Sequence, residues 1–425
     1  MTAETPTNEA VESPDATGSS IITRVLLSVA ALFLVIGLLD ATVAIVQLVL
    51  PDLFPSAAAL SYGRVAPASR LLLGGGWLTI ALLALASAVL SRIAGTEKKI
   101  PFVGLAGFAL VTVGVLAGTV GIYTGWQSGI AGQEAPLWGR AITAVGYVLV
   151  AVSIVATAKL ARDKLGATGW YLTAAPIFLA ASTVVGLVPV GNGIPGNILA
   201  AFVNSSFSLF YVASAVGLLY FVFSSITGSD QSEAGPLSAL GFWSLLVTWA
   251  HLGAIELIYS PAPDWYETLA VAFAIAALLP LMIIATDIGL MVKGLIPAIG
   301  DRASLRYAVV SSLALAIGTI GTVLLAWRAT SSVAQFSTWV QGVDAIVMLG
   351  GATFAIFAAV SVLRGGSAGR SSHFMLSTVG IVLIATGYVA GGTAVAFSWA
   401  AGPASQAYAN VGGAWKIPAD TLQPF

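Results

Sequence analysis

Eleven long apolar stretches constrain this chain more than any other feature of its sequence. Each is long enough to cross the hydrocarbon core of a bilayer, which takes about 20 apolar residues in a helix. The stretches are continuously apolar rather than alternating, which favours helices over the strands of a barrel. We therefore predict an all-α, polytopic membrane helix bundle. The expected spans are residues 21–50, 70–94, 101–125, 138–161, 168–192, 197–225, 236–259, 266–294, 305–329, 338–363 and 374–398.

The composition supports a lipid environment and excludes several classes of site. Hydrophobic residues make up 58% of the chain and charged residues 8%, whereas a soluble domain carries roughly a quarter charged residues. The net charge of −1 offers nucleic acid no basic field. The absence of cysteine excludes disulfides, iron–sulfur clusters, thiolate zinc sites and cysteine-ligated copper.

Two short segments flank the predicted transmembrane domain, residues 21–398. Residues 1–20 carry four acidic and no basic residues, so we expect a disordered, acidic, cytoplasmic tail. Residues 399–425 are expected to form an outer C-terminal tail. With the N-terminus inside, twelve basic residues fall at inner span ends and five at outer ends. Because cytoplasmic loops are enriched in Lys and Arg, we predict a multi-pass protein of the cell membrane with a cytoplasmic N-terminus and an outer C-terminus.

Four motifs at the second, sixth, seventh and tenth spans carry a resemblance to a known family. The seventh span ends in GAIELIY (253–259), and the loop after it contains PDW (263–265). The others are YGRVAPAS (62–69), FVNS (202–205) and WVQGVDA (339–345). They resemble the ligand-bearing helices of heme–copper oxidase subunit I, especially the C-type oxidase and nitric oxide reductase branch. The resemblance implies the helix bundle of that family.

The resemblance also implies that the metal-binding histidines of the family are missing. The family's ligand positions are occupied by Ser69, Asn204, Ile255, Glu256, Val343 and Ala345. Two hemes and a copper need about six imidazoles in this architecture, and imidazole suits both metals far better than Asn or Ser. The chain has two histidines, His251 and His373. We therefore expect no copper, no heme pair, and no oxygen- or nitric-oxide-reducing activity.

The two histidines have different expected roles. We expect His373 to be a solvated residue of an inner loop. His251 is expected inside the seventh span as a hydrogen-bonded interior side chain. The alternative is that His251 ligates a single heme b, with Met348 or a water as the second ligand.

Four carboxylates lie away from the ends of the predicted spans: Asp40, Glu256, Asp287 and Asp344. A charge at the bilayer centre costs ~2.5–3.5 kcal/mol on insertion scales, so each should face protein or water. We expect Asp287 to be a structural acid near Lys293. Glu256 and Asp344 fall in the vacated metal region, and with Asp40 they are candidate contacts for protons or a quinone.

Three functions are left open by the sequence. The first is a non-catalytic, oxidase-subunit-I-like membrane subunit of a respiratory or other redox complex, which anchors an electron-transfer partner at the outer face. The second is a transporter or proton channel that uses the vacated metal pocket. The third is a quinone-binding or single-heme b subunit that uses His251. Because large empty cavities are costly, we expect the second, sixth, seventh and tenth helices to close inward over the vacated region. The alternatives are that aromatic side chains such as Phe207, Trp243 and Trp249 fill it, or that lipid or a quinone occupies it.

Overall fold

The computed structural model describes residues 21–96, 101–130, 132–191, 193–228, 235–365 and 371–400. The two predicted tails lie outside these residues, apart from residues 399–400 at the end of the last helix. The described residues form helices and turns without strands, which confirms the predicted all-α class.

Eleven helical segments in the described chain are long and apolar enough to cross a membrane, which confirms the predicted number. Several consist of consecutive helices joined end to end. In chain order the elements are α1 (Ile21–Val49), α2 (Tyr62–Arg70) with η2 (Leu71–Leu78) and α3 (Thr79–Ile93), α4 (Phe102–Thr124), α5 (Leu137–Leu160), α6 (Gly166–Val185), α7 (Ile194–Thr227), α8 (Pro236–Trp249) with η4 (Leu252–Leu257), α9 (Asp264–Ala276) with α10 (Leu278–Val292) and η5 (Lys293–Ala298), α11 (Ala303–Ala326), α12 (Arg328–Ala334), α13 (Trp339–Ala345) with η6 (Ile346–Ala352) and α14 (Thr353–Leu363), and α15 (Ser371–Ala400).

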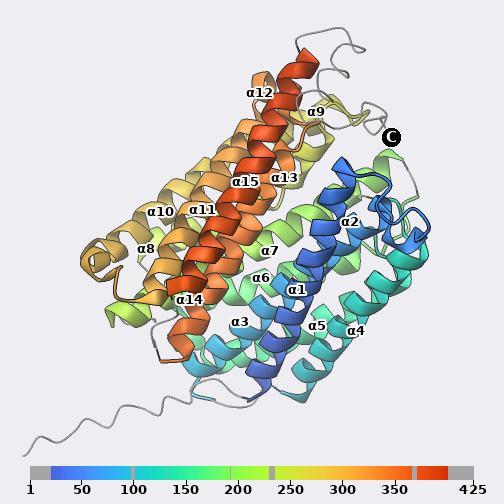
Figure 1. The fold of residues 1–425 in the computed structure, drawn as a ribbon. Helices are drawn as coiled ribbons and strands as arrows, with labels where there is room; N and C mark the ends of the chain where they lie inside the picture. The colour runs from blue at the N-terminus through green and yellow to red at the C-terminus, as the bar shows by residue number, and fades with distance from the viewer. Residues whose placement is uncertain are drawn as a thin grey trace, which may run out of the picture.

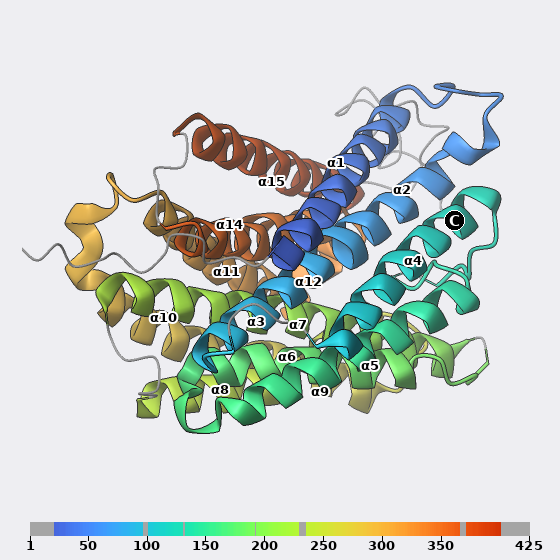
Figure 2. The ribbon, with the colours of Figure 1, turned by 90° about the horizontal axis from the view of Figure 1, so that it is seen from below.

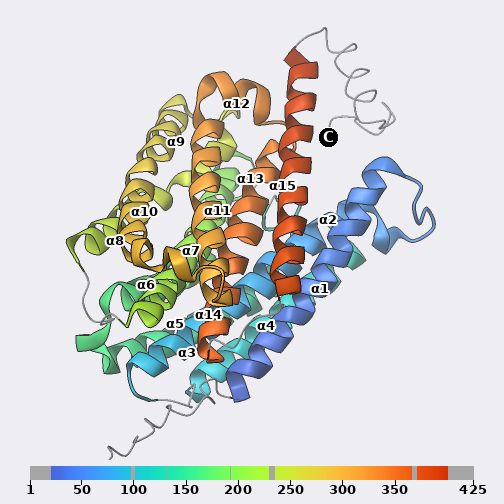
Figure 3. The ribbon, with the colours of Figure 1, turned by 60° about the vertical axis from the view of Figure 1, so that its left-hand side comes forward.

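The spans differ in how deeply they are buried. In the most apolar 18-residue stretch of the α2–α3 span, and in that of α7, 89% of the residues are buried. These two spans therefore form the centre of the bundle. In the corresponding stretch of α15 only 6% of the residues are buried, and Figure 2 shows this helix at the periphery of the bundle. The beginning of α1 and the end of α15 lie at opposite ends of the bundle (Figure 1), as an odd number of spans requires. The short helix α12 lies at the same end as the end of α15 (Figure 3).

Helices α4 and α5 pack closely because glycine allows their backbones to approach. A Cβ added at Gly114 of α4 would lie 2.5 Å from Cγ2 and 2.8 Å from the backbone nitrogen of Thr143 on α5. Small residues at such contacts are the usual means of helix association in lipid. This contact fixes α5 beside α4 and so positions the loop between them.

The second and seventh spans depart from their predicted ranges. The second begins at Tyr62 rather than residue 70, because α2 adds helical turns with one face, Val65 and Pro67–Ser69, buried against the rest of the protein. In the seventh, α8 ends at Trp249 and the chain continues as the 3₁₀ turn η4. The backbone nitrogen of Gly253 donates a hydrogen bond to Oγ of Ser205 on α7. This contact holds η4 against α7, so residues 255 and 256 lie on a turn rather than on a straight helix.

Candidate functional site

A cavity of about 450 Å³ lies within the bundle. Residues of the second, sixth, seventh and tenth spans line it, together with residues 132–135 of the α4–α5 loop. Arg70, Asn204 and Asp344 are the ninth, eleventh and sixth residues of helical segments that begin at Tyr62, Ile194 and Trp339. These three even-numbered spans run in the same direction. The cavity therefore lies in the half of the bundle where they begin.

The persistence of this cavity corrects the expectation that the four helices close inward. Phe207 and Trp249 line the space, whereas Trp243 is 63% exposed and is not part of the lining. Closure would press Glu256 and Asp344 into an apolar interior, and burying a charge without a partner is strongly unfavourable. The charged side chains in the lining therefore oppose closure of the walls.

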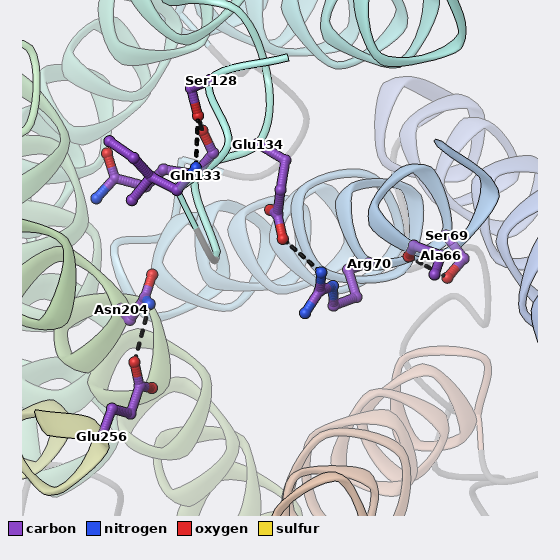
Figure 4. Close-up of polar contacts among 9 residues, drawn as sticks. Ala66, Ser69, Arg70, Ser128, Gln133, Glu134, Asn204 and Glu256 are labelled. Atoms are coloured by element: carbon purple, nitrogen blue, oxygen red, sulfur yellow. Dashed lines mark hydrogen bonds and ion pairs between the residues drawn. The ribbon is translucent and has the colours of Figure 1, made fainter. Parts of the chain in front are cut away.

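The structure brings together four of the six positions that resemble metal-ligand sites. Asn204, Ile255, Glu256 and Val343 all line the cavity. The amide nitrogen Nδ2 of Asn204 donates a hydrogen bond of 3.2 Å to Oε2 of Glu256 (Figure 4). These two residues are 52 positions apart in the sequence. Their contact supports the register in which the family motifs were placed on the sixth and seventh spans.

The other two positions do not line the cavity. Ser69 is buried, and its Oγ donates a 2.8 Å hydrogen bond to the carbonyl of Ala66 on the same helix. Figure 4 shows Ser69 well apart from Asn204 and Glu256. Ala345 is half-buried on α13 and is likewise absent from the lining.

Two arginines and a loop carboxylate complete the cavity wall. Nη2 of Arg70 lies 2.5 Å from Oε1 of Glu134 (Figure 4), and Nη1 of Arg140 donates a 2.5 Å hydrogen bond to Oε1 of Gln133. The loop is also pressed against α7, because Gly132 has a φ of +76° and no room for a Cβ beside Asn204. These groups were not predicted from the sequence. Arg70 and Arg140 served there only as basic charges at outer span ends, and no local sequence pattern shows that residues 132–135 fold inward.

Glu256 and Asp344 direct their accessible surface toward the cavity. Both side chains line it, and both retain accessible surface although they belong to interior spans. Glu256 is held by Asn204. The carboxylate of Asp344 makes no hydrogen bond or ion pair within the described part of the chain. The candidate polar contacts of the vacated region are thus both available to a bound molecule.

The histidines lie elsewhere. His251 follows the end of α8, is exposed, and packs its ring on Phe273 at a centroid distance of 4.4 Å. It is therefore not the interior residue that was expected. Met348 lines the cavity whereas His251 does not, so the structure gives no support to their sharing a heme. His373 lies on α15 rather than in a loop, and its Nδ1 is 2.6 Å from Oη of Tyr307.

The remaining intramembrane acids have structural partners. Asp287 accepts hydrogen bonds from Oη of Tyr220 at 2.8 Å and Oγ of Ser238 at 2.6 Å. Asp287 therefore has the structural role expected of it, with hydroxyl partners from α7 and α8 in place of the nearby Lys293. Asp40 accepts a hydrogen bond from Oη of Tyr123 on α4. Neither acid lines the cavity.

The donor chemistry of the cavity does not fit a copper ion or a heme pair. Its lining offers carboxylate, amide and hydroxyl oxygens and the thioether of Met348, but no imidazole and no thiolate. Copper and heme iron prefer imidazole over such oxygen donors. Within the described residues, no three His, Cys, Asp or Glu side chains come close enough together to hold a metal ion.

Comparison with known proteins identifies the architecture. A family model described as cytochrome c and quinol oxidase polypeptide I matches residues 21–416. The chain belongs to this family. The family match confirms the resemblance drawn from the four motifs and the oxidase-like helix bundle.

Curated relatives within the family are distant. A cytochrome c oxidase subunit 1 homolog (bacteroid) of Bradyrhizobium diazoefficiens is 24% identical over 301 residues, which are 63% of this chain and 52% of that protein. Cytochrome c oxidase subunit 1 of Rhodobacter capsulatus is 25% identical, over 43% of this chain and 36% of that protein. The Cbb3-type cytochrome c oxidase subunit CcoN1 of Stutzerimonas stutzeri is 23% identical, over 47% of this chain and 44% of that protein. The chain thus matches about half or less of the length of each of these relatives.

Proposed function

We propose that this oxidase-family chain is a non-catalytic membrane subunit of a respiratory or other redox complex in the cell membrane. The observation that carries the proposal is the donor set of the cavity. Positions that resemble metal-ligand sites converge there as Asn204, Ile255, Glu256 and Val343, and neither histidine of the chain lines the space. A wall of this composition retains the architecture of the family without ligands suited to heme and copper.

An assembly with other subunits is supported by the exposed face of α15. The curated relatives are named as subunits. Open space surrounds Gly380 and Gly387 of α15, where an added Cβ would meet no atom within 4 Å. Small residues on a membrane helix allow another helix to approach closely. We therefore place a transmembrane helix of a partner subunit on this face. The anchoring role assigned to residues 399–425 lies outside the described residues and stays a prediction.

Purification from native membranes tests the subunit role. We expect the tagged chain to co-purify with defined partners in a fixed ratio, and Gly387→Leu to reduce their recovery by filling the α15 face. Gly289→Leu is the matched control, since Gly289 on α10 is also surrounded by open space. Isolation of the wild-type chain alone from gently solubilised membranes would contradict the proposal. Equal loss of partners in both variants would contradict the placement on α15.

The charged cavity favours transport of a small solute or a proton as a second candidate function. Glu256 and Asp344 present acidic groups to a space that the helices leave open. Proteoliposomes with an internal pH dye would show proton flux that Asp344→Asn abolishes and Asp287→Asn leaves intact. Fluxes equal to those of empty liposomes would contradict proton conduction. The quinone or single-heme alternative loses its support from His251, which lies outside the cavity.

A further inference from the structure

We propose that the cavity binds a small organic ammonium ion, with Glu256 and Asp344 as its anionic contacts. The proposal goes beyond the subunit role, but it rests on the proposed absence of heme from this space. Pockets that bind small molecules usually measure about 300–1,000 Å³. The cavity, at about 450 Å³, lies within that range.

The charges of the lining leave one negative charge in excess. Arg70 and Glu134 form an ion pair with each other. The other charged residues of the lining are Arg140, Glu256 and Asp344. One cation against two anions leaves a site that a monovalent cation makes neutral. The guanidinium of Arg70 is held by the carboxylate of Glu134.

Hydrogen-bond acceptors in the lining lack donors. Asp344 makes no hydrogen bond or ion pair within the described residues, and Glu256 accepts one bond, from the amide of Asn204. Oε1 of Gln335 is buried without a partner, and this residue also lines the cavity. Of these acceptors, Oε1 of Gln335 is buried, and a buried acceptor without a donor is costly, whereas the two carboxylates are accessible to a bound molecule. A primary ammonium group carries three N–H donors and a positive charge, so it satisfies acceptors and charge together.

An aromatic wall favours an organic cation over a hydrated metal ion. Tyr147, Phe207 and Tyr211 all line the cavity. The ring of Phe207 lies 6.3 Å from that of Tyr147 and 6.2 Å from that of Tyr211, centroid to centroid. Aromatic faces attract cations and pack against apolar groups. An ammonium ion with an apolar body therefore matches both the carboxylates and the aromatic side chains.

Calorimetry on the full chain in lipid nanodiscs tests this inference with three probes of one shape. The probes are 2-phenylethylammonium, its neutral analogue 2-phenylethanol, and the anion 3-phenylpropionate, with empty nanodiscs to correct for partitioning. We expect the ammonium to bind at least about ten-fold more tightly than the alcohol, as one charge-assisted hydrogen bond provides. The anion should not bind. Asp344→Asn and Glu256→Gln should each weaken ammonium binding by about ten-fold or more, whereas Asp287→Asn should leave it unchanged.

Several results would overturn the assignment. Equal binding of the ammonium and the alcohol would remove the role of charge, and unchanged binding by Asp344→Asn would remove the carboxylate contact. Full displacement of the probe by sodium at the same concentration would point to an inorganic cation instead. The wild-type probe series does not depend on the variants folding. Heme bands in the spectrum would overturn the proposed function, whereas a heme-free protein that ignores the ammonium probe would overturn only this inference.

Discussion

Breaking the ion pair between Arg70 and Glu134 should destabilise the cavity wall in an asymmetric way. The pair joins α2 to the loop before α5, with the Arg70 side chain 61% exposed and that of Glu134 13% exposed. Arg70→Gln leaves a largely buried carboxylate without its cation. Glu134→Gln leaves an arginine that still reaches accessible space. We therefore expect Arg70→Gln to cost more free energy of unfolding than Glu134→Gln.

The size of the coupling follows from the separation and the burial of the two groups. At 2.5 Å, the Coulomb attraction in an effective dielectric of about 20 is roughly 7 kcal/mol before desolvation is subtracted. Exposed pairs retain only about 0.2–1 kcal/mol of such attraction, whereas breaking a buried pair costs about 3–5 kcal/mol. With one partner exposed and the other mostly buried, we expect a coupling free energy of about 1–3 kcal/mol.

A double-mutant cycle in mixed micelles measures this coupling from the unfolding free energies of the two single variants and the double variant. Arg64→Gln is the matched control on the same helix, because Nη1 of Arg64 donates to the backbone carbonyl of Tyr123 rather than to a carboxylate. When Arg64→Gln is combined with Glu134→Gln, the changes in unfolding free energy of the two single variants should add to within about 0.5 kcal/mol. A coupling of Arg70 and Glu134 below that value, or a larger cost for Glu134→Gln than for Arg70→Gln, would refute the reasoning.

Three further predictions concern packing, an interior acid and sidedness. Gly114→Leu should destabilise the α4–α5 contact by about 1–3 kcal/mol or more through steric overlap, measured as a lower unfolding temperature, while Gly380→Leu on the open face of α15 should change it little. Tyr220→Phe removes one of the two hydrogen bonds to Asp287, so we expect a loss of about 0.6–1.5 kcal/mol; an unchanged unfolding free energy would show that this bond contributes nothing. Reporter fusions should place the N-terminus in the cytoplasm and the C-terminus outside, and signals from both on one side would contradict the eleven-span topology.

The number of spans could be predicted because it depends on local hydrophobic length alone. Their ends depended on tertiary contacts that no local pattern shows. The polar turns Tyr62–Arg70 are helical because the protein covers Val65, Ala68 and Ser69. The end of α8 at Trp249 is tied to the contact of Gly253 with Ser205 on another helix. The length of an apolar stretch in the sequence shows neither of these tertiary contacts.

Only those residues of the candidate site that lie within the family motifs could be predicted from the sequence. The motifs placed Asn204 and Glu256 in one region, and the structure joins them by a hydrogen bond. No motif covers Glu134, which enters the cavity wall from a loop. For Asp287, nearness in sequence suggested Lys293, whereas its partners are distant in sequence. The cavity remains open with charged side chains in its lining, a contribution that the cost of an empty cavity alone does not include.

The metal and heme content of the purified chain tests the central claim most directly. The measurement is a reduced-minus-oxidised visible spectrum together with elemental analysis for copper and iron, scaled to protein concentration. Because the cavity offers no imidazole, we expect no copper and no heme pair, and therefore no pair of low-spin and high-spin heme signals. Stoichiometric signals from both hemes would contradict the account, since they would require ligands that Asn204, Ile255, Glu256 and Val343 do not provide.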